Sequence, residues 1–214
     1  MAFDADAIEI RVLGCLIEKQ RTTPDQYPLS LNSLRLACNQ ATNRDPVVDY
    51  DERTIKAALE RLSLRGWTRF ASGASSRALK YRHLFDEALG LTDGEISLLA
   101  VLMLRGPQTL GELKARSERL HRFETLDEVQ QTLDRLAERE LVVRLERRPG
   151  QKEERYAQLL GGDGADRAFE PVTAAVGAEP DALDRVAALE ERVERLEREL
   201  AELREGLRPA HPNP

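Results

Sequence analysis

The stretch LERLSLRGW, residues 59–67, decides the fold, because a close copy, LDRLAEREL, follows 74 residues later at 133–141. Both copies end a run in which apolar residues recur every three or four positions, the spacing of one face of an α-helix. Each then leads into two short extended runs separated by turn residues, which is the pattern of a β-hairpin. The sequence therefore predicts that one helix-and-hairpin unit occurs twice.

Two further helices are predicted before the first copy. The first unit then has helices at 7–20, 30–39 and 51–65, followed by hairpin strands at 67–71 and 78–83. Three helices followed by a two-stranded wing is the order of a winged helix, a relative of the helix-turn-helix.

The second unit repeats this order and marks its helix starts clearly. At each start a threonine stands three residues before a glutamate, and the pairs are Thr92 with Glu95, Thr109 with Glu112 and Thr125 with Glu128. This is the capping-box pattern, in which each side chain accepts a free backbone N–H of the first helical turn. The second hairpin is predicted at 141–147 and 154–159.

We therefore expect a mainly α fold of the α+β class. It consists of two tandem winged-helix domains, each three helices plus a β-hairpin wing, followed by a C-terminal coiled-coil helix. The expected boundaries are 1–86 for the first domain, 87–160 for the second, 161–180 for a flexible linker, 181–208 for the coiled coil and 209–214 for a disordered tail. Glycines and prolines in the linker, and prolines after the coil, predict these last boundaries.

Three stretches resemble a known family. Residues 17–47 (IEKQRTTPDQYPLSLNSLRLACNQATNRDPV), 91–120 and 142–160 are similar to the YceH-like proteins, a family of uncharacterised bacterial proteins. The resemblance covers about residues 7–160 and implies the same tandem winged-helix fold. It implies no established activity, ligand or catalytic residue, so it leaves the function open.

The formal net charge of −6 is unevenly distributed. Residues 161–214 hold 7 Lys/Arg and 13 Asp/Glu, whereas residues 7–84 hold 13 basic and 8 acidic side chains. Local charge decides nucleic-acid binding, and the first unit is basic although the whole chain is acidic.

The third helix of this fold is the usual groove reader, so the first unit is the candidate for binding double-stranded DNA. The candidate contacts lie on that helix, its wing and the preceding loop, and they are Arg44, Arg53, Lys56, Arg61, Arg69, Arg77, Lys80 and Arg82. Such a basic helix and wing could neutralise several phosphates. The alternative is an ordinary charged surface, since Glu60 interrupts the outward face of the helix.

The second unit differs in charge. Its third helix presents Asp127, Asp134 and Glu138 outward, and phosphate would be repelled by them. We expect this domain to hold a protein partner, to dimerise or to pack. The alternative function for the whole chain is therefore a protein–protein interaction scaffold that uses winged-helix domains as docking surfaces without DNA binding.

The C-terminal segment carries a heptad pattern. Its apolar residues alternate at spacings of three and four, as Val186, Leu189, Val193, Leu196, Leu200, Leu203 and Leu207. Opposite charges flank these positions, which predicts a parallel homodimer through residues 183–207. The alternative is an amphipathic helix that folds back on the body, since the coil is short.

The sequence has no Gly-rich phosphate loop, no zinc-type Cys/His spacing and no nucleophile motif, so we expect no enzyme, no cofactor and no metal. Cys15 and Cys38 lie among apolar residues and are expected to be small core residues in a reducing compartment. Nothing resembles a secretory signal or a membrane span of roughly 20 apolar residues. We therefore expect a cytoplasmic protein without membrane contact.

Overall fold

The computed structural model describes residues 3–71, 79–147 and 153–161. In this part the protein is rich in helices and has small antiparallel sheets, as the α+β class predicts. The predicted linker from residue 162, the coil positions Val186 to Leu207 and the tail lie outside the described residues.

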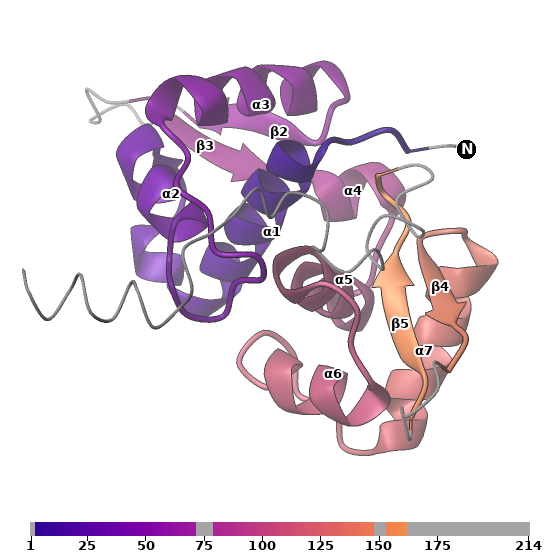
Figure 1. The fold of residues 1–214 in the computed structure, drawn as a ribbon. Helices are drawn as coiled ribbons and strands as arrows, with labels where there is room; N and C mark the ends of the chain where they lie inside the picture. The colour runs from indigo at the N-terminus through magenta and orange to yellow at the C-terminus, as the bar shows by residue number, and fades with distance from the viewer. Residues whose placement is uncertain (1–2, 72–78, 148–152, 162–214) are drawn as a thin grey trace, which may run out of the picture. The chain divides into compact units, whose positions relative to one another are not determined.

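The first unit has its helices and strands where the sequence predicts them (Figure 1). They are α1 (Ala7–Thr22), α2 (Leu31–Cys38), α3 (Glu52–Leu64), β2 (Thr68–Ala71) and β3 (Lys80–His83). The prediction missed three short elements, which are a 3-10 turn at Pro24–Gln26, β1 (Leu29–Ser30) and α4 (Phe85–Leu89). β1 is short because α2 begins directly after it, with the Ser30 side chain accepting from the backbone N–H of Ser33 at 3.2 Å.

The second unit repeats the order of the first. Its elements are α5 (Asp93–Arg105), α6 (Leu110–Ser117), α7 (Leu126–Glu138), β4 (Val142–Leu145) and β5 (Arg155–Gln158). In both units the residue two positions before the second helix pairs with a tyrosine of the hairpin. Leu29 of β1 pairs with Tyr81 of β3, and Gln108 forms an isolated bridge to Tyr156 of β5.

Helix caps explain where the helices begin. Thr92 with Glu95 and Thr109 with Glu112 form the predicted capping boxes. Thr125 caps α7 by accepting from the N–H of Glu128 at 3.1 Å. The Glu128 carboxylate accepts instead from the N–H of Glu124 at 2.9 Å, so the third predicted box is closed on one side only.

The two units also share the turn that ends the third helix. The N–H of Trp67 donates to the Leu62 carbonyl at 2.9 Å, and the N–H of Leu141 donates to the Leu136 carbonyl at the same distance. The residue before each has a positive φ, and a left-handed residue at this point is a common way to end a helix. The repeat seen in the sequence is therefore also a repeat of backbone geometry.

α1 and α5 pack against each other and join the apolar cores of the two units into one. The two helices approach closely at Gly14, where a Cβ atom would lie 3.1 Å from the Leu104 side chain and from the Met103 Cβ. Glycine permits this approach because it has no side chain. Neither helix indicates this contact in its own periodicity, so it could not be predicted from the sequence.

Candidate nucleic-acid interface

The third helix of the first unit has an inner and an outer face. Asp51 caps it by accepting from the N–H of Thr54 at 2.7 Å. The inner face is buried, and its residues are Ile55, Ala58, Leu59 and Leu62. The outer face exposes Arg53, Lys56, Glu60 and Leu64, so two of the predicted contacts lie where a ligand could reach them.

The hairpin lies beside this helix (Figure 1), where the Thr68 hydroxyl donates to the Leu59 carbonyl at 3.3 Å. Arg69 on β2 is exposed and stands opposite Arg82 on β3, and Lys80 is half-buried. Residues directly opposite in an antiparallel pair project on the same face of the sheet, so Arg69 and Arg82 share a face.

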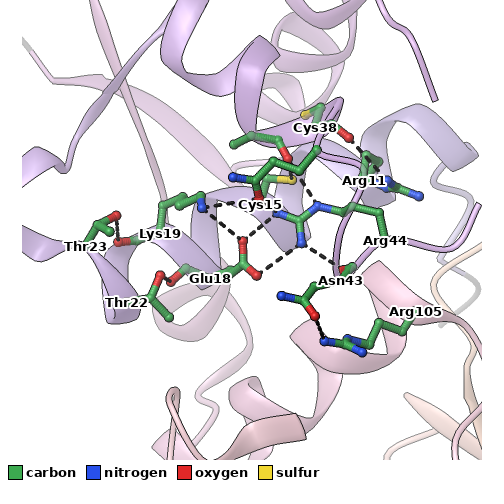
Figure 2. Close-up of polar contacts among 12 residues, drawn as sticks. Arg11, Cys15, Glu18, Lys19, Thr22, Thr23, Cys38, Asn43, Arg44 and Arg105 are labelled. Carbon is green, nitrogen blue, oxygen red and sulfur yellow. Dashed lines mark hydrogen bonds and ion pairs between the residues drawn. The ribbon is translucent and has the colours of Figure 1, made fainter. Parts of the chain in front are cut away.

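Arg44 must be removed from the predicted interface, because its side chain is buried (Figure 2). Its guanidinium donates to both carboxylate oxygens of Glu18, at 3.1 and 2.6 Å, and to the Ala37 carbonyl at 3.1 Å. Burial opposes the charge on Arg44, but the Glu18 carboxylate outweighs it and raises the guanidinium pKa. Arg44 therefore holds the loop after α2 to α1 and is not available to phosphate.

Two further predicted contacts are engaged by carboxylates of the same chain. Arg61 donates to Asp6 at 2.6 Å and lies 3.6 Å from the buried Glu9. Arg82 donates to Glu87 at 2.6 Å. Neutralised arginines contribute little attraction for phosphate. Arg77 lies outside the described residues.

Four of the predicted contacts keep a free charge. Arg53, Lys56, Arg69 and Lys80 form no ion pair with any residue in 3–71, 79–147 or 153–161. The first two lie on α3 and the other two on the hairpin. Cations on a helix and an adjacent hairpin can contact successive phosphates along a duplex.

Exposed apolar side chains lie on the same helix and hairpin. The exposed fractions are 89% for Leu64, 55% for Phe70 and 63% for Leu79. The helical periodicity places Leu64 outside, whereas it says nothing of Phe70 and Leu79, which depend on the twist and pairing of a short hairpin. Exposed apolar side chains of this size are frequent in protein contacts.

The corresponding helix of the second unit has no such free cations. On α7, Asp127, Asp134 and Glu138 are exposed. The one outward arginine, Arg135, has its Nε 3.5 Å from the buried Glu95 carboxylate. The charge difference between the two third helices is therefore present in the folded protein.

The part of the chain that the structure describes contains no group of three or more His, Cys, Asp or Glu side chains placed to hold a metal ion. Both cysteines are buried and neither is in a disulfide. Among the described residues, no helix combines the length and apolar character needed to cross a membrane.

Comparison with known proteins gives a consistent match over most of the chain. The family model described as "Protein of unknown function, DUF480" matches residues 5–151. A UPF0502 protein of Solibacter usitatus is 48% identical over 204 residues, covering 95% of this chain and 98% of the relative. A UPF0502 protein of Pectobacterium atrosepticum is 44% identical over 214 residues, covering 97% and 98%. The resemblance to YceH-like proteins is thereby confirmed, and the chain belongs to the DUF480 family, with the UPF0502 proteins as its relatives.

Proposed function

We propose that this chain is a non-enzymatic protein of two tandem winged-helix modules, and that the first module binds duplex DNA. Two repeated features support the module assignment. Each unit has three helices followed by an antiparallel hairpin, and in each the residue two positions before the second helix pairs with a hairpin tyrosine. A short strand before the second helix that joins the wing belongs to this architecture.

One observation supports DNA binding above the others. α3 exposes Arg53 and Lys56, and the adjacent hairpin carries Arg69 and Lys80, all four without an ion pair in the described parts of the chain. In this fold the third helix enters the major groove and the wing lies along the backbone. Free cations at both places supply the sequence-independent attraction on which DNA affinity largely depends.

The second module has a different role in this proposal. Its α7 exposes Asp127, Asp134 and Glu138, and these carboxylates would be repelled by phosphate. A basic protein surface is the complementary partner for this face. The first module therefore contacts DNA, and the second is free to hold a protein.

The test is a salt titration of the full chain binding to a fluorescent random-sequence duplex, followed by anisotropy. If the first module contacts several phosphates, the affinity for DNA should fall by orders of magnitude between about 50 and 200 mM salt. This is the salt dependence of DNA-binding proteins with several phosphate contacts. The double variant Arg53→Glu/Lys56→Glu should bind at least about tenfold more weakly and lower the salt slope by about 2.

A charge-matched control separates a local contact from the overall charge. Arg119→Glu/Arg122→Glu makes the same change in net charge on exposed positions of the second module. It should leave affinity nearly unchanged. Binding that is absent or insensitive to salt in the intact chain, or an equal loss in both double variants, contradicts the proposal.

A second candidate function is a protein-docking scaffold, and the 89% exposed Leu64 on the outer face of α3 favours it. Leu64 is the last residue of α3, and a large exposed apolar side chain at this end of the helix suits a protein contact better than a contact with phosphate. Under this alternative, Leu64→Asp abolishes capture of a protein partner that survives nuclease treatment. Under DNA binding, Arg53→Glu/Lys56→Glu has the larger effect, and nuclease removes the bound material.

A further inference from the structure

A polar cavity of about 310 Å³ lies where the loop after α2 meets the start of α6 and the hairpin of the second unit. Four arginines line it, and they are Arg44, Arg105, Arg116 and Arg155. The carboxylates in its lining are Asp45 and Glu112. None of the DNA-contact residues proposed above belongs to it, so the cavity is a separate feature.

The ion pairs in the cavity leave positive charge unmatched. Glu112 forms ion pairs with two arginines, with its carboxylate 2.9 Å from Arg155 Nη1 and 3.4 Å from Arg116 Nη2. Arg105 donates to the amide oxygen of Asn43 (Figure 2) and forms no ion pair with the described residues. Two carboxylates, Asp45 and Glu112, therefore face the guanidinium groups of Arg105, Arg116 and Arg155, while the charge of Arg44 is matched by Glu18 outside the lining.

The positive charge of Arg105 is destabilised by its surroundings, and a bound anion would stabilise it. Burial, together with the nearby charge of Arg116, lowers the pKa of Arg105. Two guanidinium groups that repel each other across a polar hollow attract a ligand oxyanion, which can accept several charge-assisted hydrogen bonds from both.

Gln108 adds a second, independent feature. Its Nε2 donates to the carbonyls of Arg105, Gly106 and Pro107, at 3.0, 3.3 and 2.9 Å. These three contacts fix which end of the amide is nitrogen. The Oε1 atom is buried and has no hydrogen-bond partner in the described parts of the chain, although Gln108 is 3% exposed and lines the cavity. A buried acceptor without a donor is costly, and a ligand hydroxyl would satisfy it.

We infer that this cavity binds a small hydroxylated oxyanion, with the anionic group between Arg105 and Arg116 and a hydroxyl donating to Gln108 Oε1. The anionic group is a phosphate ester or a carboxylate, since both offer the oxygens that paired guanidinium groups bind. The volume suits a molecule of a few carbon atoms with one such group. This inference does not depend on DNA binding.

Isothermal titration calorimetry of the full chain at constant ionic strength tests it. The probes are glycerol 3-phosphate, glycerate and methyl phosphate. Direct heat is the readout because phosphate raises the melting temperature of many proteins by exclusion from their surface. One of the two hydroxylated probes should saturate at millimolar concentration or below, and which of them does so identifies the anionic group. Methyl phosphate should bind several-fold more weakly than glycerol 3-phosphate.

Variants assign the binding to this cavity. Arg105→Gln and Arg116→Gln should each weaken binding at least about tenfold, and Arg105→Lys should retain part of it because the charge remains. Arg122→Gln, at an exposed position outside the cavity lining, should bind as the wild type does. Circular dichroism checks that each variant is folded. Absence of binding by both hydroxylated probes, or unchanged affinity in folded Arg105→Gln, overturns the inference, and equal affinity for methyl phosphate overturns the role of Gln108.

Discussion

Glu9 Oε1 lies 3.6 Å from Nε of Arg61, joining the first turn of α1 to the last turns of α3. The second unit contains the same arrangement, with Glu95 Oε1 3.5 Å from Nε of Arg135. Both carboxylates are buried and both also close a capping box at the start of their helix. The same ion pair therefore fixes the angle between the first and third helices in each unit.

Truncating either carboxylate should destabilise the protein by a similar amount. Glu9→Ala and Glu95→Ala each remove a capping contact and a buried carboxylate that faces two arginines, and we expect each to lower the free energy of unfolding by about 1–2 kcal/mol. Urea unfolding followed by circular dichroism measures this. Glu138→Ala, on the exposed face of α7, should change it by less than about 0.5 kcal/mol. An unchanged free energy of unfolding in Glu95→Ala would refute the structural role of this pair.

A β-branched side chain at Gly14 should disrupt the contact between the two units. Gly14→Val must displace Leu104 and Met103, whose atoms would lie 3.1 Å from the new Cβ, so we expect a loss of about 1–3 kcal/mol. Gly111→Val is the matched control, because Gly111 is also helical and nothing lies within 4 Å of a Cβ placed there. Equal stability of the two variants in thermal unfolding would show that the close approach of α1 and α5 is not required.

The ion pair between the buried Arg44 and Glu18 predicts an effect on stability and none on DNA contact. Arg44→Ala takes the nearer cation away from the Glu18 carboxylate and leaves it Lys19 at 3.6 Å, so we expect a loss at the low end of that for breaking a buried pair, about 3 kcal/mol. Arg53→Ala, on the exposed outer face of α3, should change stability by no more than about 0.5 kcal/mol. An Arg44→Ala protein as stable as the wild type would mean that this arginine is not a structural residue.

His83 predicts a loss of stability in acid. Burial, opposed by Asp86 and assisted by Arg82 and Arg21, lowers the pKa of His83 to about 4. The unfolded chain has the ordinary value near 6.5, so between these limits the unfolded state binds more protons than the folded state. Stability contributed by neutral His83 is therefore complete above about pH 6.5 and falls as the pH drops toward 4, by about 3 kcal/mol in total.

Urea unfolding of the wild type and His83→Gln from pH 7.5 to 4 checks this. The side chain also contacts Gln20 and faces Asp86 at 3.4 Å, so the variant itself is expected to be less stable. The quantity to compare is therefore the slope of the unfolding free energy against pH. This slope should be smaller in His83→Gln than in the wild type. Parallel curves would rule out His83 as a source of the pH dependence.

The heptad positions from Val186 to Leu207 predict the oligomeric state. The full chain should elute with the mass of a dimer in light scattering coupled to size-exclusion chromatography, because opposite charges flank the apolar positions. Changing Leu196 and Leu200 to Asp should reduce the mass to that of a monomer. A monomeric wild-type chain at micromolar concentration would favour the fold-back alternative.

Helix starts and hairpins were predictable because they depend on near neighbours. The Thr92 cap and its Glu95 partner are three residues apart, so the pattern can be read directly along the chain. β1 was missed because two residues give no periodicity, and Leu29 is extended through its pairing with Tyr81, far along the chain. For the candidate DNA surface, the sequence predicted the outward direction of Arg53 and Lys56 correctly, whereas Arg44 proved to be buried.

The sequence by itself determined the order of the main helices and hairpin strands, the repeat and the inner faces of α3 and α7, since hydrophobic periodicity and capping act within one or two helical turns. The tertiary structure decided which cations remain free and where an arginine-lined cavity forms. Glu18 stands 26 residues before Arg44, and Asp6 stands 55 residues before Arg61. Charges neutralise one another at a distance of a few ångströms in space, and that distance depends on how the helices pack rather than on their separation in sequence.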